Sequence, residues 1–126
     1  GQAPFSSTAL QLAALLQKSR LHRIKSDELW HFHLGGALRL TQISPEGKVE
    51  DFILGPDIKK GHRLQHAVPA RYWFGAEPEP EPGSGFCFVG CTVAPGFDFA
   101  DFDLGSRATL LARFPDARET VLRLTD

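Results

Sequence analysis

The 126-residue sequence lacks any apolar run near the roughly 18 residues that a membrane-spanning helix needs. It also lacks a charged start followed by an apolar stretch, so it shows no secretory signal. Its net charge is −1 and it contains no long basic run, so it offers no positive surface to a nucleic-acid backbone. We therefore expect no membrane partner, no nucleic-acid partner and a cytoplasmic location.

Cysteine is scarce, with Cys87 and Cys91 the only two, both in the apolar run Phe86 to Val93. Four residues of an extended strand span about 13 Å, beyond the roughly 7 Å that a disulfide allows between Cα atoms. The spacing is neither Cys-x-x-Cys nor that of a zinc finger. We expect two buried, reduced thiols in a sheet.

Composition indicates one ordinary globular domain. Hydrophobic residues make up 42% and charged residues 23% of the chain, typical values for such a domain. The length suffices for a single core, so residues 1–126 are expected to form one domain.

Short apolar and aromatic runs alternate with turn residues along most of the chain. Residues Ser6 to Gln17 fit both a strand and a helix, with the strand favoured. Ser44 to Gly47 predicts a turn, the acidic-proline stretch Glu77 to Gly85 predicts a loop outside any sheet, and Ser106 is a candidate N-cap for a helix up to Phe114. The other expected strands are Leu29–Leu34, Ala37–Ile43, Lys48–Leu54, Arg63–Val68, Arg71–Ala76 and Phe86–Val93. The pattern predicts a β-sandwich or barrel followed by short helices.

Three stretches resemble the small RmlC-like cupins, the cupin_5 family: SDELWHFHLG, LGPDIKKGHRLQHAVPARYWF and, most specifically, CTVAPGFDFADF at Cys91 to Phe102. The resemblance runs from about Ser6 to the C-terminus. It implies an all-β cupin double-stranded β-helix (a jelly-roll barrel) with short C-terminal helices, an internal ligand pocket and a homodimer. It also favours a strand at Ser7 to Leu16. Family members usually carry residues before that strand, so we expect an N-terminal family segment to be missing here. The activity of the family is, on this resemblance, unassigned.

Metal-binding cupins typically present His-x-His, a nearby Glu, and a later His after a Pro-x-Gly turn. On this sequence the second histidine falls on His22 and the acid on Glu28, whereas Arg20 and Phe74 stand at the other two ligand positions. His31-Phe32-His33 is no substitute, because no acid follows it up to Thr41. We expect no metal cofactor, with substitute ligands such as His66 left open.

Strand alternation predicts which side chains face the interior. If Glu28 points inward, Trp30 and Phe32 do too, while His31 and His33 face outward as structural or dimer-interface residues. Trp30 and Trp73 are then candidate ligand-binding walls, with core packing the alternative reading. Phe32, Gln65 and Cys91 complete the expected ligand-binding set, Gln65 as a neutral hydrogen-bonding contact.

His22 and Glu28 are the candidate catalytic residues, because a carboxylate beside an imidazole can orient it and raise its basicity. A turn-stabilising hydrogen bond between them is the alternative. The expected function is binding of a small polar metabolite, sugar- or nucleotide-like, in the barrel, with metal-independent epimerase or isomerase chemistry. Tyr72, the only tyrosine, would lie outside if Trp73 lies inside, which weakens that chemistry. A non-catalytic metabolite-binding dimer is the alternative, and a metal-dependent oxygenase is less favoured.

Overall fold

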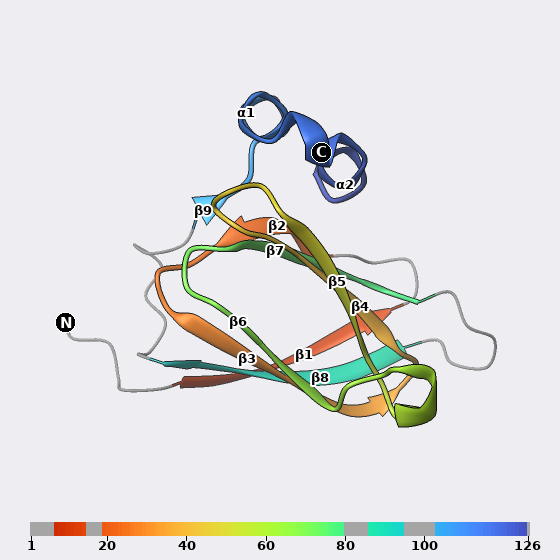
Figure 1. The fold of residues 1–126 in the computed structure, drawn as a ribbon. Coiled ribbons are helices and arrows are strands. Elements are labelled where there is room, and N and C mark those ends of the chain that lie inside the picture. The colour runs from red at the N-terminus through yellow and green to blue at the C-terminus, as the bar shows by residue number, and fades with distance from the viewer. Residues whose placement is uncertain (1–6, 15–18, 80–85, 95–102, 126) are drawn as a thin grey trace.

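The computed structural model describes residues 7–14, 19–79, 86–94 and 103–125, and within them two antiparallel sheets face each other (Figure 1). The first has the order β1-β8-β3-β6, formed by β1 (Ser7–Ala14), β8 (Phe86–Ala94), β3 (Asp27–Gly35) and β6 (Gln65–Val68). The second has the order β5-β4-β7-β2-β9, formed by β5 (Val49–Leu54), β4 (Leu38–Ile43), β7 (Trp73–Pro78), β2 (Ser19–Arg23) and β9 (Asp103–Leu104). The architecture is the predicted jelly roll.

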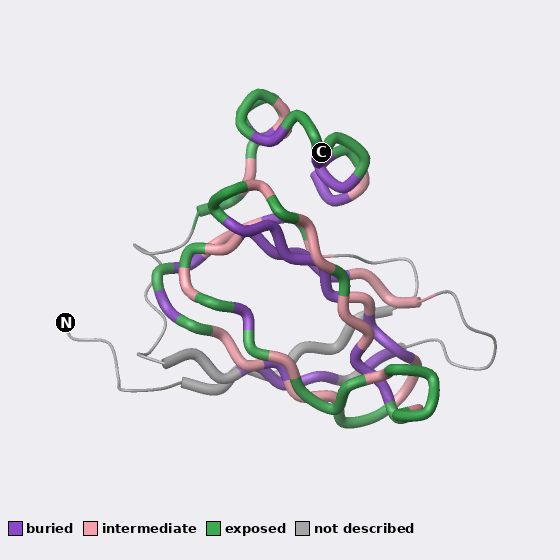
Figure 2. Tube along the Cα trace, viewed as in Figure 1, coloured by how far each residue is buried: buried purple, intermediate pink, exposed green. Residues whose placement is uncertain are grey.

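The inward faces of the two sheets form one hydrophobic core. Its largest members are Trp30 of β3 and Phe74 of β7, whose rings meet edge to face with centroids 6.2 Å apart. Buried residues line the inside of the barrel in Figure 2. The remaining members of this interior cluster are Ile24, Leu38, Leu40, Leu54, Val68, Ala76, Cys87, Val89 and Cys91, with Phe32 and Tyr72 packed against them. Such burial of aromatic and aliphatic surface is the main stabilising term of the fold.

A second core lies between the outer face of the second sheet and the C-terminal helices (Figure 1). Leu21, Ile43 and Trp73 point outward from β2, β4 and β7 into it. The helical elements are α1 (Arg107–Arg113), η3 (Pro115–Ala117) and α2 (Arg118–Arg123), and a further short turn, η1 (Ile58–Lys60), follows β5. The Leu21 N–H donates to the Leu124 carbonyl at 2.9 Å, which ties the helices to β2.

Local signals in the sequence are reproduced at two places. Ser106 is the N-cap of α1, its hydroxyl accepting from the Thr109 N–H at 3.5 Å. The turn Ser44 to Gly47 joins β4 to β5, with Gly47 at φ 93°, a conformation that favours glycine.

Strand bounds differ from the prediction in β7 and β6. β7 runs from Trp73 to Pro78, so two residues assigned to the acidic-proline loop pair with β4 instead, Pro78 opposite Leu38. Pro78 ends the strand, where its missing N–H costs little. β6 begins at Gln65, two residues after the predicted start at Arg63. Short strands β2 and β9, which the sequence pattern did not single out, complete the second sheet.

Cys87 and Cys91 are both buried on β8 and form no disulfide, as predicted. Among the described residues, no helix is long and apolar enough to span a bilayer.

Candidate functional site

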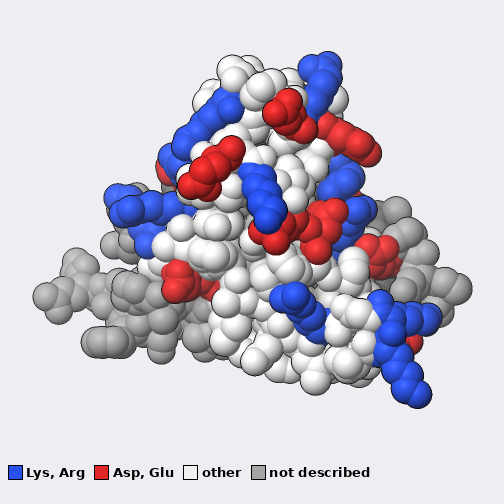
Figure 3. Space-filling view, in the orientation of Figure 1, with Lys and Arg blue, Asp and Glu red and all other residues white. Residues whose placement is uncertain are grey.

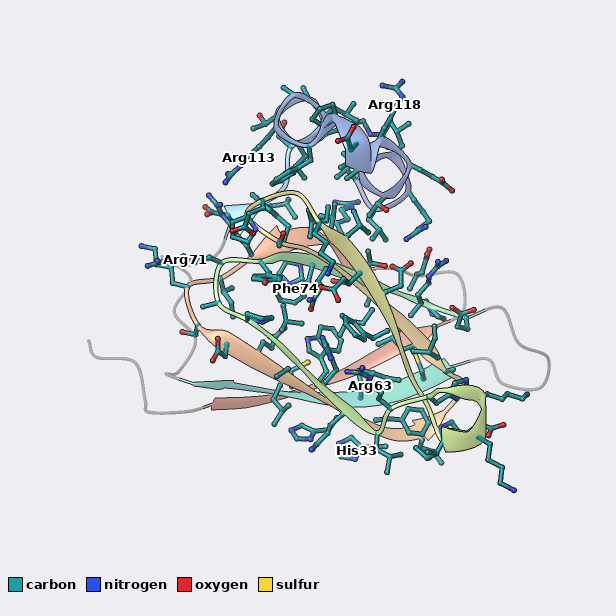
Figure 4. The ribbon with its side chains drawn as sticks, viewed as in Figure 1. His33, Arg63, Arg71, Phe74, Arg113 and Arg118 are labelled. Carbon is teal, nitrogen blue, oxygen red and sulfur yellow. The ribbon has the colours of Figure 1, made fainter. Side chains whose placement is uncertain are left out.

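Strand register decides which side chains share the barrel interior. On β3, Trp30 lies directly opposite Cys91 of β8 and His66 of β6, and Glu28 lies opposite Val68. Directly opposed residues point to the same face of a sheet, so these side chains line one wall together. Trp30 and Cys91 are buried, and Phe32 packs against the same cluster. His33 is exposed on the other face of β3, and Figure 4 shows it on the outside of the barrel.

Glu28 is a titratable group whose pKa this interior changes strongly. Burial raises the pKa of its carboxyl to about 7, and the Trp30 indole N–H partly opposes the rise. The indole and the carboxyl are neighbours without meeting in standard hydrogen-bond geometry. Near neutral pH the group therefore exchanges between its acid and its carboxylate form, as a general acid or base must.

The indole nitrogen of Trp30 is buried and has no hydrogen-bond partner among the described residues. A buried donor without an acceptor costs roughly 1–3 kcal/mol. The indole nitrogen of Trp73, beneath the helices, is also buried and has no hydrogen-bond partner among the described residues. Trp30 differs because it adjoins a titratable carboxyl inside the barrel, so a donor and a group that can both donate and accept stand side by side.

Cys91 lies on the same wall. Burial first, and then the charge of Glu28, raise the pKa of the Cys91 thiol far above its ordinary value. The thiol is thus protonated near neutral pH and lines the wall as an apolar group rather than as a nucleophile.

His22 lies on the opposite wall. It is paired with Phe74 across β2 and β7, and the two rings are tilted at 52° with centroids 4.2 Å apart. Its Nδ1 donates to the Arg20 carbonyl at 2.7 Å, which fixes the orientation of the ring. Burial lowers the pKa of His22, and the hydrogen bond to Arg20 partly offsets this. A neutral imidazole therefore predominates near neutral pH.

The structure does not bring His22 and Glu28 together. No hydrogen bond or ion pair joins these two described residues, and neither changes the pKa of the other. Phe74 contacts both the His22 ring and the Trp30 ring. The two candidate catalytic residues are thus separate functional groups on facing walls.

Gln65 does not belong to this interior. It is exposed and pairs with His31, on the face of β3 opposite to that of Trp30. The neighbouring His66 points inward instead, and its Nε2 lies 3.0 Å from the buried Gln42 Oε1 on the facing sheet. Its ring stacks on Phe52 at 3.9 Å. The expectation for Gln65 was wrong by one residue, which in a strand reverses the face.

Trp73 is likewise not a wall of the barrel. It pairs with Ile43 and packs under the C-terminal helices, whereas the next residue, Phe74, occupies the interior (Figure 4). Trp73 is therefore a core residue, as the alternative to a ligand-binding wall predicted, but it belongs to the second core. Trp73 faces away from the barrel rather than into it, and Tyr72 packs against the interior cluster. The objection that Tyr72 must lie outside is therefore removed.

The described residues do not fit the four-ligand metal site of cupins. The resemblance to metal-binding cupins assigns two ligand positions to Arg20 and Phe74, and the Phe74 ring, which has no donor atom, packs inside the barrel. Within residues 19–79, 86–94 and 103–125, no three His, Cys, Asp or Glu side chains lie close enough to share an ion. His66 is held by Gln42 and Phe52 instead.

Comparison with solved structures identifies the fold. The chain superposes on a structural-genomics protein from Shewanella oneidensis with TM-score 0.90 and 38% identity, covering 98% of this chain and 77% of that one. A hypothetical protein from Leishmania major gives TM-score 0.91 and 27% identity, with 96% and 76% coverage. A dTDP sugar isomerase from Desulfovibrio desulfuricans gives TM-score 0.70 at 14% identity, with 90% and 71% coverage, and so shows the fold alone.

No curated protein matches the chain. The model of the family Cupin_5, described as Cupin superfamily (DUF985), matches residues 2–105, which is most of the sequence. That match and the similarity to the Shewanella protein agree with each other. The chain belongs to the Cupin_5 family of the cupin superfamily.

Proposed function

We propose that the barrel binds a small polar metabolite, sugar- or nucleotide-like, through the Trp30 indole N–H and the Glu28 carboxyl. The observation that carries the proposal is the pairing of a buried donor that has no described acceptor with a carboxyl whose pKa is raised to about 7. A ligand hydroxyl or carbonyl placed between them would accept from the indole and exchange a hydrogen bond with Glu28. The cost of the unmet donor would then be recovered on binding.

The chemistry that this arrangement supports is proton transfer without a metal, as in an epimerase or isomerase. Glu28 is the proposed acid or base on one wall, since its pKa lies near the working pH. His22, neutral near neutral pH, is the proposed second group on the facing wall, and Tyr72 packs against the same interior cluster. An epimerase needs groups on two sides of its substrate, and these residues come from different strands and turns. The dTDP sugar isomerase that shares the fold is consistent with this class of substrate.

The second candidate function is metabolite binding without turnover, by a homodimer. The separation of His22 from Glu28 favours it, because no preassembled acid–base pair is present among the described residues. Trp30 and Glu28 would then serve recognition alone.

The test uses a dTDP sugar as probe, first for binding and then for turnover. Binding is followed through Trp30 fluorescence in the Trp73→Phe variant, which removes the only other indole. Turnover is followed as incorporation of deuterium from D2O into carbon-bound positions of the sugar. Saturable binding with deuterium uptake that Glu28→Gln abolishes supports the isomerase. Binding without uptake supports the non-catalytic module, and absence of binding contradicts the proposal for this ligand class.

A further inference from the structure

A cleft of about 150 Å³ lies at one end of the barrel, apart from the interior wall just described. It is lined by Arg23, Ile24, Lys25, Arg71 and Asp103. The Arg71 N–H donates to the Ile24 carbonyl at 2.8 Å, so the turn after β2 and the turn before β7 are fixed side by side. The volume is several times the roughly 15 Å³ that one ordered water needs, so the cleft has room for a group of several heavy atoms.

Among the described residues, the lining is mainly cationic, with three basic side chains and one carboxylate. Asp103 accepts from Arg23 Nε at 3.0 Å, and the Arg23 guanidinium also lies over the Trp73 ring, 4.7 Å from its centroid. These two contacts hold Arg23 in one position at the edge of the cleft. An arginine fixed in this way loses little conformational freedom when it binds a ligand.

Arg71 has a different character. It is exposed and enters no hydrogen bond or ion pair through its side chain in the part of the chain that the structure describes. Figure 4 shows its side chain extending away from the barrel, and positively charged groups gather at the same level in Figure 3. Its guanidinium is therefore available to an anion from solvent.

The backbone of Arg71 points to a role for its side chain. Its φ is 69°, the only positive φ among the described non-glycine residues. Glycine adopts this conformation without the steric cost that a Cβ brings. A long basic side chain at such a position is the kind of outlier that accompanies ligand binding.

We propose that Arg23, Lys25 and Arg71 form a binding site for a phosphate group of a small metabolite. Arginine presents a planar array of donors that matches phosphate oxygens, and lysine adds a point charge. The proposal goes beyond the interior site and does not depend on it, because none of these three residues contributes to the interior cluster.

The experiment is calorimetric titration with inorganic pyrophosphate at constant ionic strength, using chloride to replace it in the reference. Wild type should bind saturably. Arg71→Gly and Arg71→Gln should each weaken binding about tenfold, the loss expected for one charge-assisted hydrogen bond. The matched control is Lys59→Gln, which removes one charge from the exposed η1 turn and should change affinity less than about twofold.

The melting temperature separates a binding role of Arg71 from a purely structural one. Arg71→Gly relieves the positive φ, so its melting temperature should equal or exceed that of wild type while pyrophosphate binding falls. Glu28→Gln, which alters the interior site, should bind pyrophosphate like wild type. Absence of binding by wild type, unchanged affinity in both Arg71 variants, or an equal loss in Lys59→Gln would each overturn the proposal.

Discussion

The imidazole of His22 packs against the ring of Phe74, with 4.2 Å between the ring centroids. On the resemblance to metal-binding cupins, Phe74 stands at the position of their last histidine ligand, and an apolar ring fills that place here. The same ring meets the Trp30 ring edge to face, with 6.2 Å between the centroids. Phe74 therefore links His22 of the second sheet to Trp30 of the first through ring contacts inside the barrel.

Glu28→Gln should change how stability depends on pH. The folded pKa of Glu28 is about 7 against an ordinary 4.5, so between these values the folded chain retains a proton that the unfolded chain loses. Stability contributed by Glu28 is complete below pH 4.5, falls as pH rises through this window and is lost above pH 7. The difference amounts to at most about 3 kcal/mol.

Urea unfolding of wild type and Glu28→Gln between pH 4 and 8 measures this effect. The variant lacks the charge, so it should gain stability relative to wild type as pH rises. Asp57→Asn, a change at an acid outside the barrel interior, is the control. Parallel pH profiles for wild type and Glu28→Gln would contradict a buried, neutral Glu28.

His66→Ala should lower the free energy of unfolding more than Gln65→Ala does. Gln65→Ala removes an exposed side chain and should change the free energy of unfolding by less than about 0.5 kcal/mol. His66→Ala leaves the buried Gln42 carbonyl without its described partner and should cost about 1–3 kcal/mol. Chemical denaturation of both variants is the measurement. A larger loss in Gln65→Ala than in His66→Ala would show that the register of β6 is shifted.

Trp73→Ala should destabilise the helix-covered core without changing the interior site. Loss of a buried tryptophan costs about 3–5 kcal/mol, and here it would loosen α1 and α2 from the sheet. Hydrogen exchange should therefore accelerate in Arg107–Arg113 and Arg118–Arg123 more than in Asp27–Gly35. Acceleration confined to β3 would place Trp73 in the barrel after all.

Cys91 should resist alkylation in the folded protein. Cys91 is 3% exposed, so the reagent cannot reach the thiol. Burial also raises the pKa of the thiol, so little of the reactive thiolate is present. Iodoacetamide labelling at pH 8, followed by mass spectrometry, should modify Cys91 only after unfolding in urea. Rapid labelling of native protein would contradict the buried position, and a matched Cys87→Ser variant assigns the modified residue.

Much of the fold could be predicted because its signals are local. Alternating apolar residues placed Trp30 inward and His33 outward, and a serine before a helical pattern marked the start of α1. The site was harder to predict because it depends on the register between strands. Trp73 and Phe74 are both aromatic and buried, so composition could not tell which of them faced the barrel.

The same limit applied to the choice between Gln65 and His66 in the short strand β6. It also applied to the cleft at Arg71, which joins residues from turns far apart in the sequence. No spacing rule links Arg23 to Arg71, and the positive φ of Arg71 is visible only in the folded chain.

The most direct measurement on the proposed interior site is the pKa of the Glu28 carboxyl in the folded protein. Its side-chain carboxyl carbon can be followed by NMR in ¹³C-labelled protein as pH is varied, with Glu28→Gln identifying the resonance. We expect a midpoint of about 7, as required of a group that donates and accepts protons at neutral pH. A midpoint near the ordinary 4.5 would show a solvated carboxylate, and the acid–base role of Glu28 would have to be abandoned.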